Sequence, residues 1–326
     1  MKVGIIGAGY IGKKRAANLP SGVKVSVVCD LNKTAGLKSA SELSCDYEQD
    51  WKNVVKNKNI DALFIAVTHN WLAQIGVEAI KNGKHVLIEK PGAKNLNEFN
   101  ELIKAHIKNP VAVMFGYNHR YHPALIKAKE FVDSKKFGEV MFIRARYGHG
   151  ARLGYEKEWR FNEKISGGGE LIDQGPHLID LVNYLVGEMN EVTGFTSTMF
   201  WKTDLEDNAF FIMRNDKKQI AHLCVTCVEW KNIFSFEIML KTAKIQIEGL
   251  GRSYGDERMV LYKMKPEMGP PVVEEFNFPK EDLSWKLENE AFFEKIRNKD
   301  YSDTALLEGQ YVHKVIKKIY KLNREN

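Results

Sequence analysis

The pattern of hydrophobic and polar positions changes character about a third of the way along the chain. Up to about residue 118, short and nearly continuous apolar runs alternate with stretches of helical periodicity. Such runs are typical of strands that are covered on both faces, and their alternation with helices predicts parallel βαβ units in a doubly wound sheet. The predicted strands cover residues 3–6, 23–29, 62–66, 85–88 and 111–115, with helices such as 71–82 and 96–106 between them.

After a predicted helix at residues 123–135, the apolar runs become rich in aromatic and β-branched residues, with few helices between them. This change predicts a mostly antiparallel sheet and therefore an α+β second domain. Its predicted strands are residues 140–147, 192–199, 209–213, 220–228, 233–240, 243–248 and 272–276, and its predicted helices are 170–185, 285–297 and 305–322. We therefore expect an α/β fold with a doubly wound parallel domain at residues 1–118. A second domain with a large, mostly antiparallel open sheet follows at residues 119–326.

Composition and charge narrow the classes of partner. The 326 residues include 48 Lys and Arg against 42 Asp and Glu, and the two signs are interspersed. The densest basic runs, Lys13-Lys14-Arg15 and residues 314–321, lie on predicted helices. We interpret them as solvated helix faces, so we expect no nucleic-acid partner.

Cysteine content and hydropathy indicate the cellular compartment in which the protein is expected. Only four cysteines occur, no leader-like segment precedes the first strand, and no apolar run approaches the roughly 18 residues of a membrane span. Sparse cysteine usage favours a reducing compartment. We therefore expect a cytoplasmic protein with no membrane segment.

The first chemical signal is the segment Gly7-Ala8-Gly9-Tyr10-Ile11-Gly12, which follows a predicted strand and opens a predicted helix. In that context, G-x-G-x-x-G is the fingerprint of a Rossmann dinucleotide-binding domain. Gly7 permits a tight turn, Gly9 lets the backbone approach a pyrophosphate, and Gly12 lets the helix pack on the strand. We predict that these glycines, with Tyr10 and Ile11, bind the cofactor.

Asp30 ends the next predicted strand, 18 residues after Gly12. A carboxylate at this place accepts hydrogen bonds from the adenosine ribose and repels a 2′-phosphate. The sequence therefore predicts NAD as the cofactor, with NADP less favoured. Lys33 lies nearby and is a cation that could tolerate the phosphate.

The second signal, Glu89-Lys90-Pro91, follows the predicted strand 85–88. The carboxyl end of that strand faces the crevice where ligands bind in open α/β sheets. A lysine there can hold or deprotonate a substrate hydroxyl, and a cationic nicotinamide would make it a better base. The alternative is a surface lysine before a turn proline.

The third signal is a run of three glycines, residues 167–169, that leads into a helix. Asp173 and His177 are four residues apart and therefore share one helix face, where they could act as an acid–base pair. Pro176 is expected to kink this helix or to mark its first turn. The alternative is a partly buried histidine that is satisfied by a local carboxylate.

Three motifs follow one another along the chain: the glycine fingerprint, then Glu89-Lys90-Pro91, then Gly-Gly-Gly-x-Leu-x-Asp173-x-Gly-x-His177-x-x-Asp180. Together and in this order, they resemble the Gfo/Idh/MocA oxidoreductases, which include glucose–fructose oxidoreductase and inositol dehydrogenase. The resemblance spans the chain. It implies that Lys90, Asp173 and His177 line the nicotinamide and substrate site and that no metal is used. It also implies hydride transfer to or from a secondary alcohol of a sugar, sugar nucleotide or polyol.

The resemblance is incomplete after the third strand. The family often has Thr-Pro-x-x-x-His in this loop, whereas here His69 stands at the proline and Leu72 at the histidine. Because the loop usually touches the cofactor, we predict cofactor contacts from Thr68 and His69, and from Glu89 and Lys90 in the next loop.

Two segments are predicted to contact the substrate. Asn118 and Arg120 follow the last strand of the first domain, and Arg152, Tyr155 and Arg160 lie on a predicted loop. Arginines there would suit a carboxylate or phosphate group. The alternative is surface packing.

These observations favour an NAD-dependent dehydrogenase or reductase. In this hypothesis His177 takes the hydroxyl proton while Lys90 shares or relays it, and the pattern leaves open which of them is the base. Two alternatives are an enzyme that retains NAD and cleaves glycosides, and a non-enzymatic dinucleotide-sensing regulator. We also expect a homodimer or homotetramer, because relatives often assemble and the aromatic-rich sheet could bury a face against another subunit.

Overall fold

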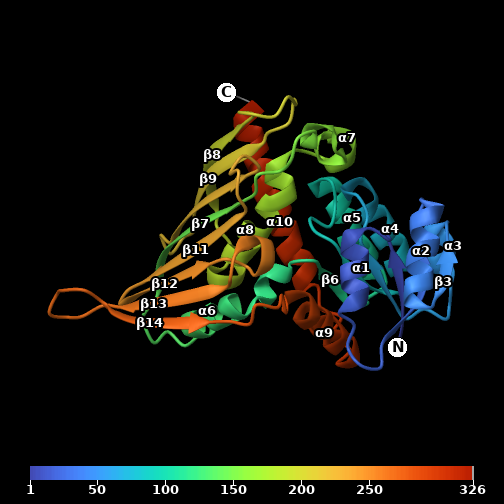
Figure 1. The fold of residues 1–326 in the computed structure, drawn as a ribbon, viewed down its shortest axis with the longest axis horizontal. Helices are drawn as coiled ribbons and strands as arrows, with labels where there is room; N and C mark the ends of the chain where they lie inside the picture. The colour runs from blue at the N-terminus through green and yellow to red at the C-terminus, as the bar shows by residue number, and fades with distance from the viewer. Residues whose placement is uncertain (325–326) are drawn as a thin grey trace. The chain divides into compact units, whose positions relative to one another are not determined.

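The computed structural model describes residues 1–324, which form two compact units (Figure 1). Unit 1 comprises Met1–Tyr117, Lys164–Gly167 and Trp285–His313. Unit 2 comprises Asn118–Glu163, Gly168–Ser284 and the described residues from 314 onward. Among residues 1–324, no helix combines the length and apolar character that crossing a membrane requires.

Unit 1 contains a six-stranded parallel sheet in the order β3-β2-β1-β4-β5-β6, which confirms the predicted doubly wound sheet. The strand order reverses between β1 and β4, so the loops that follow these two strands lie at the edge where such sheets bind ligands. The apolar pattern gives no sign of β3, because this edge strand is the polar triplet 46–48. The bounds are β1 Lys2–Ile6, β2 Lys24–Cys29, β3 Asp46–Glu48, β4 Ala62–Ile65, β5 His85–Ile88 and β6 Val113–Phe115, with α1 Tyr10–Ala17, α2 Lys33–Leu43, α3 Trp51–Lys56, α4 His69–Lys81 and α5 Leu96–Lys108.

The core of unit 1 includes a helix from far along the chain. Helix α9 (Ser284–Arg297) places Phe292 and Phe293 against Phe64 of β4, with ring centroids 5.9 Å apart in both pairs. The sequence pattern grouped this helix with the second domain. The difference arises because periodicity identifies an apolar helix face but not the sheet on which that face packs.

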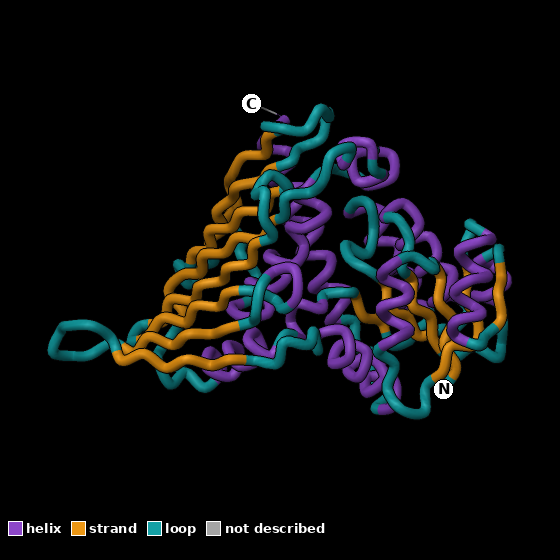
Figure 2. Tube along the Cα trace, in the orientation of Figure 1, coloured by secondary structure: helices purple, strands orange, loops and turns teal. Residues whose placement is uncertain are grey.

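Unit 2 contains an eight-stranded sheet in the order β14-β13-β12-β11-β7-β10-β9-β8. Its strands are the orange segments on the left of Figure 2. Neighbouring strands pair antiparallel except β7 and β10, which are parallel, so the predicted mostly antiparallel sheet is confirmed. The bounds are β7 Val140–Gly148, β8 Glu191–Ser197, β9 Asn208–Arg214, β10 Ile220–Thr226, β11 Ile233–Leu240, β12 Ala243–Glu248, β13 Arg258–Lys263 and β14 Val272–Asn277.

Helix α8 (Glu170–Val186) packs on the strands β7, β9 and β10 through a buried stripe that includes Leu171, Leu178 and Leu181. The helix continues through Pro176, which therefore does not mark its first turn. The remaining helical segments are η1 Asn118–Tyr121, α6 Pro123–Asp133, η2 Tyr155–Lys157, η3 Trp159–Phe161, α7 Glu163–Ser166, η4 Arg252–Tyr254 and α10 Thr304–Arg324.

Candidate functional site

The glycine turn between β1 and α1 is shaped by close packing at two of its three glycines. Gly7 has φ +103°, and a Cβ there would lie 2.2 Å from the carbonyl oxygen of Ala66. A Cβ on Gly12 would lie 1.9 Å from the carbonyl oxygen of Gly7. Gly9 is different, because a Cβ on it would meet no atom within 4 Å. The turn therefore leaves open space over Gly9, at the amino terminus of α1.

Asp30 is anchored against this turn. Its Oδ2 accepts a hydrogen bond from the backbone N–H of Ala8 at 2.7 Å, and its Oδ1 accepts one from the N–H of Asn32 at 2.8 Å. Tyr10 is exposed and Ile11 is half-buried in the first turn of α1. The structure thus brings together Asp30 and the glycine segment, and their contact with a dinucleotide stays a prediction.

Thr68 and His69 follow β4, Thr68 as the N-cap residue of α4 and His69 as its first residue. Thr68 donates a hydrogen bond from Oγ1 to Oδ1 of Asn70 at 2.8 Å. His69 is buried, and its Nδ1 lies 2.9 Å from the carbonyl oxygen of Ser166. In this structure His69 joins two chain segments of unit 1, so a cofactor contact by its ring stays a prediction.

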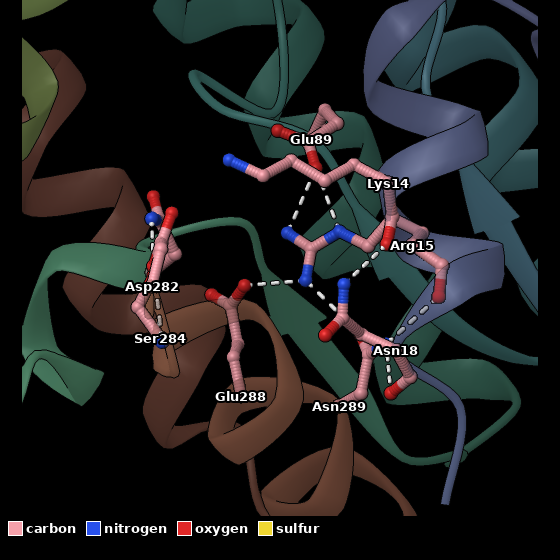
Figure 3. Close-up of polar contacts among 9 residues, drawn as sticks. Lys14, Arg15, Asn18, Glu89, Asp282, Ser284, Glu288 and Asn289 are labelled. Atoms are coloured by element: carbon pink, nitrogen blue, oxygen red, sulfur yellow. Dashed lines mark hydrogen bonds and ion pairs between the residues drawn. The ribbon is translucent and has the colours of Figure 1, made fainter. Parts of the chain in front are cut away.

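Glu89, which is predicted to touch the cofactor, forms an ion pair with Arg15 (Figure 3). Nε and Nη2 of Arg15 donate to Oε1 of Glu89 at 2.9 and 2.8 Å, while Nη1 donates to Oε2 of Glu288 and, at 3.1 Å, to Oδ1 of Asn289. Burial alone would lower the pKa of Arg15, but the carboxylates of Glu288 and Glu89 outweigh burial and raise it.

The interpretation of Lys13-Lys14-Arg15 as a solvated face is therefore wrong for Arg15, which is 0% exposed. The reason is that its carboxylate partners lie 74 and 273 residues away, where local periodicity gives no signal. Lys90 is half-buried and precedes a cis peptide bond to Pro91. The carboxylate just before Lys90 is thus held in place by a buried cation.

In unit 2, the amino terminus of α8 is capped by a residue that the sequence analysis missed. Oε1 of Glu206 accepts hydrogen bonds from the backbone N–H groups of Gly169 and Leu171 at 3.0 and 3.1 Å, and from the hydroxyl of Tyr320 at 2.6 Å. The glycine run supplies no capping side chain of its own. In the sequence, this lack of a local cap is the signal that another segment caps the helix.

Asp173 lies one turn into α8 and is 3% exposed. Its Oδ2 accepts a hydrogen bond from Nε of Arg160 at 3.0 Å, and Nη1 of Arg160 donates to Glu158 at 3.2 Å. The structure therefore pairs a predicted catalytic residue with a predicted substrate-binding residue, and the pair is a charged cluster beside the capped end of α8.

His177 lies on the next turn, within a group of aromatic rings. The ring of His119 stacks on it with centroids 3.8 Å apart and planes 16° apart. Tyr147 meets both imidazoles edge-on, and burial together with its hydrogen bond to Tyr254 raises the pKa of the Tyr147 phenol. His119, which the sequence analysis did not single out, thus fixes one face of the His177 ring.

The other predicted substrate residues differ in their contacts. Nδ2 of Asn118 donates to Oγ of Ser284 at 3.0 Å, and Arg120 makes a bidentate contact with the carboxylate of Asp180 at 2.7 and 2.5 Å. Arg152 is exposed and pairs with Glu158. Tyr155 is buried in a small core cluster with Trp201 and Cys227. Asn118, Arg120 and Tyr155 thus each have a partner within unit 2, and their contacts with a substrate stay predictions.

Two family models match the chain. One, described as an oxidoreductase family with an NAD-binding Rossmann fold, matches residues 1–117, and the other, the GFO/IDH/MocA C-terminal domain, matches residues 125–246. Together they cover more than two thirds of the sequence. The chain belongs to the Gfo/Idh/MocA oxidoreductase family.

Several Gfo/Idh/MocA relatives are similar in sequence. Levoglucosan dehydrogenase of Pseudarthrobacter phenanthrenivorans is 28% identical over 61% of this chain and 54% of that protein. Inositol 2-dehydrogenase of Salmonella typhimurium is 30% identical over 58% of this chain and 55% of that protein. The match thus spans about half the length of these curated relatives. A solved levoglucosan dehydrogenase complex with NADH and levoglucosan shares the fold, with a TM-score of 0.90 over 100% of this chain and 97% of that chain at 21% identity.

Because Gfo/Idh/MocA proteins have an NAD-binding Rossmann domain, the residues of unit 1 can be tested against that cofactor. The open space at Gly9 lies at a helix amino terminus that has neither a side-chain cap nor an acidic residue in its first turn. Such an end suits a pyrophosphate. Each oxygen of Asp30 accepts one backbone hydrogen bond and retains acceptor capacity for a ribose hydroxyl. These residues fit NAD.

Proposed function

We propose that this protein is an NAD-dependent oxidoreductase that transfers a hydride between a nicotinamide and a secondary alcohol of a sugar, sugar nucleotide or polyol. The observation that carries the proposal is the open glycine turn with the Asp30 carboxylate anchored beside it, in a chain of the Gfo/Idh/MocA family. The names of the relatives, levoglucosan and inositol dehydrogenase, support the substrate class.

The proposed cofactor is NAD rather than NADP. Gly7, Gly9, Tyr10, Ile11 and Gly12 would form the cofactor-binding turn, in which Gly9 lets the backbone approach the pyrophosphate, and Asp30 would accept hydrogen bonds from the ribose hydroxyls. A carboxylate repels a 2′-phosphate, whereas Lys33 is exposed at the start of α2 and is the nearby cation that could offset this repulsion. Thr68, His69, Glu89 and Lys90 complete the proposed cofactor set.

The chemistry requires a proton acceptor for the substrate hydroxyl. When bound, NAD⁺ supplies the acceptor for the hydride that leaves the carbinol carbon. We propose that His177 and Lys90 together take the hydroxyl proton, either one as the base and the other sharing or relaying it. Asp173 would accept a hydrogen bond from a neighbouring substrate hydroxyl or orient His177, while Arg160 balances its charge.

Substrate binding is assigned first to the Asp173–Arg160 pair. Arg160 is half-buried and retains donors that could reach an anionic group, and Arg152 is exposed at the same loop. We retain Asn118, Arg120 and Tyr155 as supporting residues, which would shape the site through the contacts described above.

A turnover screen tests the proposal. Purified protein is incubated with NAD⁺, and separately with NADP⁺, and with a pool of sugar nucleotides, sugars and inositols, while mass spectrometry follows products two mass units lighter. We expect a product with NAD⁺ from the wild type and at least a hundredfold less from Lys90→Ala, because a positioned base contributes about 10² to 10⁴-fold. An equally active Lys90→Ala would remove Lys90 from the mechanism, and a preference for NADP⁺ would overturn the role of Asp30.

A second screen, with glycosides in the pool and all products followed by mass spectrometry, separates the alternatives. A glycoside that is cleaved without build-up of NADH, with nicotinamide released from the protein on denaturation, would replace the proposal by a retained-NAD glycoside-cleaving enzyme. Cofactor binding with no turnover of any pool member would favour a dinucleotide-sensing regulator.

We also propose a homodimer or homotetramer formed through the exposed face of the unit 2 sheet, which we define by Phe195, Phe210 and Ile212. Phe195 of β8 and Phe210 of β9 pair across the strands and are both exposed, as is Ile212. Adjoining exposed apolar side chains are typical of a protein interface. Light scattering at micromolar concentration is expected to give a dimer or tetramer mass that falls in Phe210→Glu, whereas a monomeric wild type would contradict the proposal.

A cytoplasmic location is proposed on the cysteines alone. All four are free thiols, as a reducing compartment favours. Cell fractionation tests this, and recovery of the protein outside the cytoplasm would overturn it.

A further inference from the structure

The loop that carries Lys90 is anchored on both sides of that residue. On the amino-terminal side, the carboxylate of Glu89 is held by Arg15. On the carboxyl-terminal side, Nε2 of His313 lies 2.9 Å from the carbonyl oxygen of Pro91. His313 is 222 residues further along the chain, on α10, and belongs to the same unit.

The contact with Pro91 determines which ring nitrogen of His313 carries the proton. A carbonyl oxygen only accepts hydrogen bonds, so Nε2 of His313 must carry the proton. The ring is fully buried, and burial lowers its pKa from 6.5 to about 4, which keeps it neutral at ordinary pH. The ring of Phe99 packs against the His313 ring with centroids 4.9 Å apart.

The anchored atom is the carbonyl oxygen of Pro91, and its position depends on the backbone conformation directly after Lys90. Proline has no N–H, so the carbonyl is the only hydrogen-bonding group of Pro91, and its φ angle is already fixed by the ring. Holding the carbonyl therefore fixes the remaining backbone angle of the residue that follows Lys90. Gly92 adds a steric limit, since a Cβ there would lie 2.6 Å from the ring of Phe115.

We propose that His313 is a positioning residue for Lys90, which it holds by donating a hydrogen bond from Nε2 to the carbonyl oxygen of Pro91. It touches neither cofactor nor substrate in this role. The consequence for turnover rests on the function proposed for Lys90, whereas the order of the loop does not.

The loop itself provides the first test, in the protein without cofactor or substrate. The backbone N–H of Gly92 donates to the carbonyl oxygen of Glu89 at 3.0 Å. Hydrogen exchange at the Gly92 amide therefore reports how often this hydrogen bond of the loop opens. His313→Phe keeps an aromatic ring against Phe99 but has no donor, whereas His313→Gln keeps an N–H donor. We expect exchange at Gly92 to accelerate about tenfold in His313→Phe and less than about threefold in His313→Gln.

A matched internal control is the N–H of Gly116, which donates to the carbonyl oxygen of Ile88 at 2.8 Å in the same unit. Its exchange should stay unchanged in both variants. Equal acceleration at Gly92 and Gly116 would mean that unit 1 loosens as a whole, and unchanged exchange at Gly92 would mean that the bond does not hold the loop. Either result overturns the proposal. If His313→Phe does not fold, His313→Leu, which also has no donor, replaces it.

Kinetics provide the second test. We expect kcat to fall about tenfold in His313→Phe with KM for NAD⁺ nearly unchanged, and to recover in His313→Gln. A wild-type kcat in His313→Phe would overturn the proposal. If the wild type turns over no substrate, the proposed function fails, and the exchange result still decides whether His313 orders the loop.

Discussion

At the scale of single residues, the stacked imidazoles of His119 and His177 are the most specific contact at the candidate site. Both rings are buried, and a phenyl ring would fit the stack about as well as an imidazole. We expect His119→Phe to keep kcat within about threefold of wild type and His119→Ala to lose about tenfold or more, because the His177 ring would lose its platform. Steady-state kinetics on the substrate found in the screen measure this, and an equal loss in both variants would show that His119 acts through its nitrogens instead.

Residues in the candidate site differ in how far sequence could identify them. Asp173 and His177 stand four residues apart on one helix, and that spacing alone puts them on one face. Arg15, by contrast, lies in a basic run that looks like a solvated surface, and only the three-dimensional fold brings Glu89 and Glu288 to it. Contacts between distant segments leave no local pattern, which is why Arg15 and His119 were missed.

At the scale of elements, Glu206 caps the amino-terminal end of α8, the helix that carries Asp173 and His177. Burial raises the pKa of Glu206, and three donors converge on its Oε1. In Glu206→Gln the amide oxygen can still accept from these donors, whereas Glu206→Ala leaves them without an acceptor. We expect Glu206→Ala to lower the free energy of unfolding by about 3 kcal/mol and Glu206→Gln to lower it by less than about 1 kcal/mol.

Urea denaturation at neutral pH measures both changes, with wild type as the reference. A Gln variant as unstable as the Ala variant would mean that the charge of Glu206, rather than its hydrogen bonds, stabilises the helix end. That outcome would also contradict the inference that burial disfavours the ionised carboxylate at this position.

The elements themselves were largely predictable. The apolar runs of unit 1 and the glycine turn follow from local pattern and steric requirement, and both sheets have the predicted character. The packing of α9 was not predictable, because its apolar face would fit either sheet. The cap on α8 was not predictable either, since Glu206 lies 35 residues beyond Leu171 and nothing in the intervening sequence marks it as a partner.

At the scale of the whole molecule, a buried histidine and a half-buried one link stability to pH. Burial lowers the pKa of His313 from 6.5 to about 4, and burial also lowers the pKa of His85. Between about pH 4 and pH 6.5, the unfolded chain binds a proton at His313 that the folded chain does not bind. This contribution to stability is therefore complete above about pH 6.5 and is lost as the pH falls toward 4, by at most about 3 kcal/mol.

The comparison of wild type with His313→Gln isolates this effect, because every other titrating group is shared. We expect the free energy of unfolding of the wild type to fall more steeply than that of the variant between about pH 7 and pH 4.5, with the difference between them shrinking as acid is added. Urea denaturation at a series of pH values measures both curves. Parallel curves would mean that His313 titrates near its ordinary pKa in the folded protein, and the hydrogen bond to Pro91 would then come from an imidazole that is accessible to solvent protons.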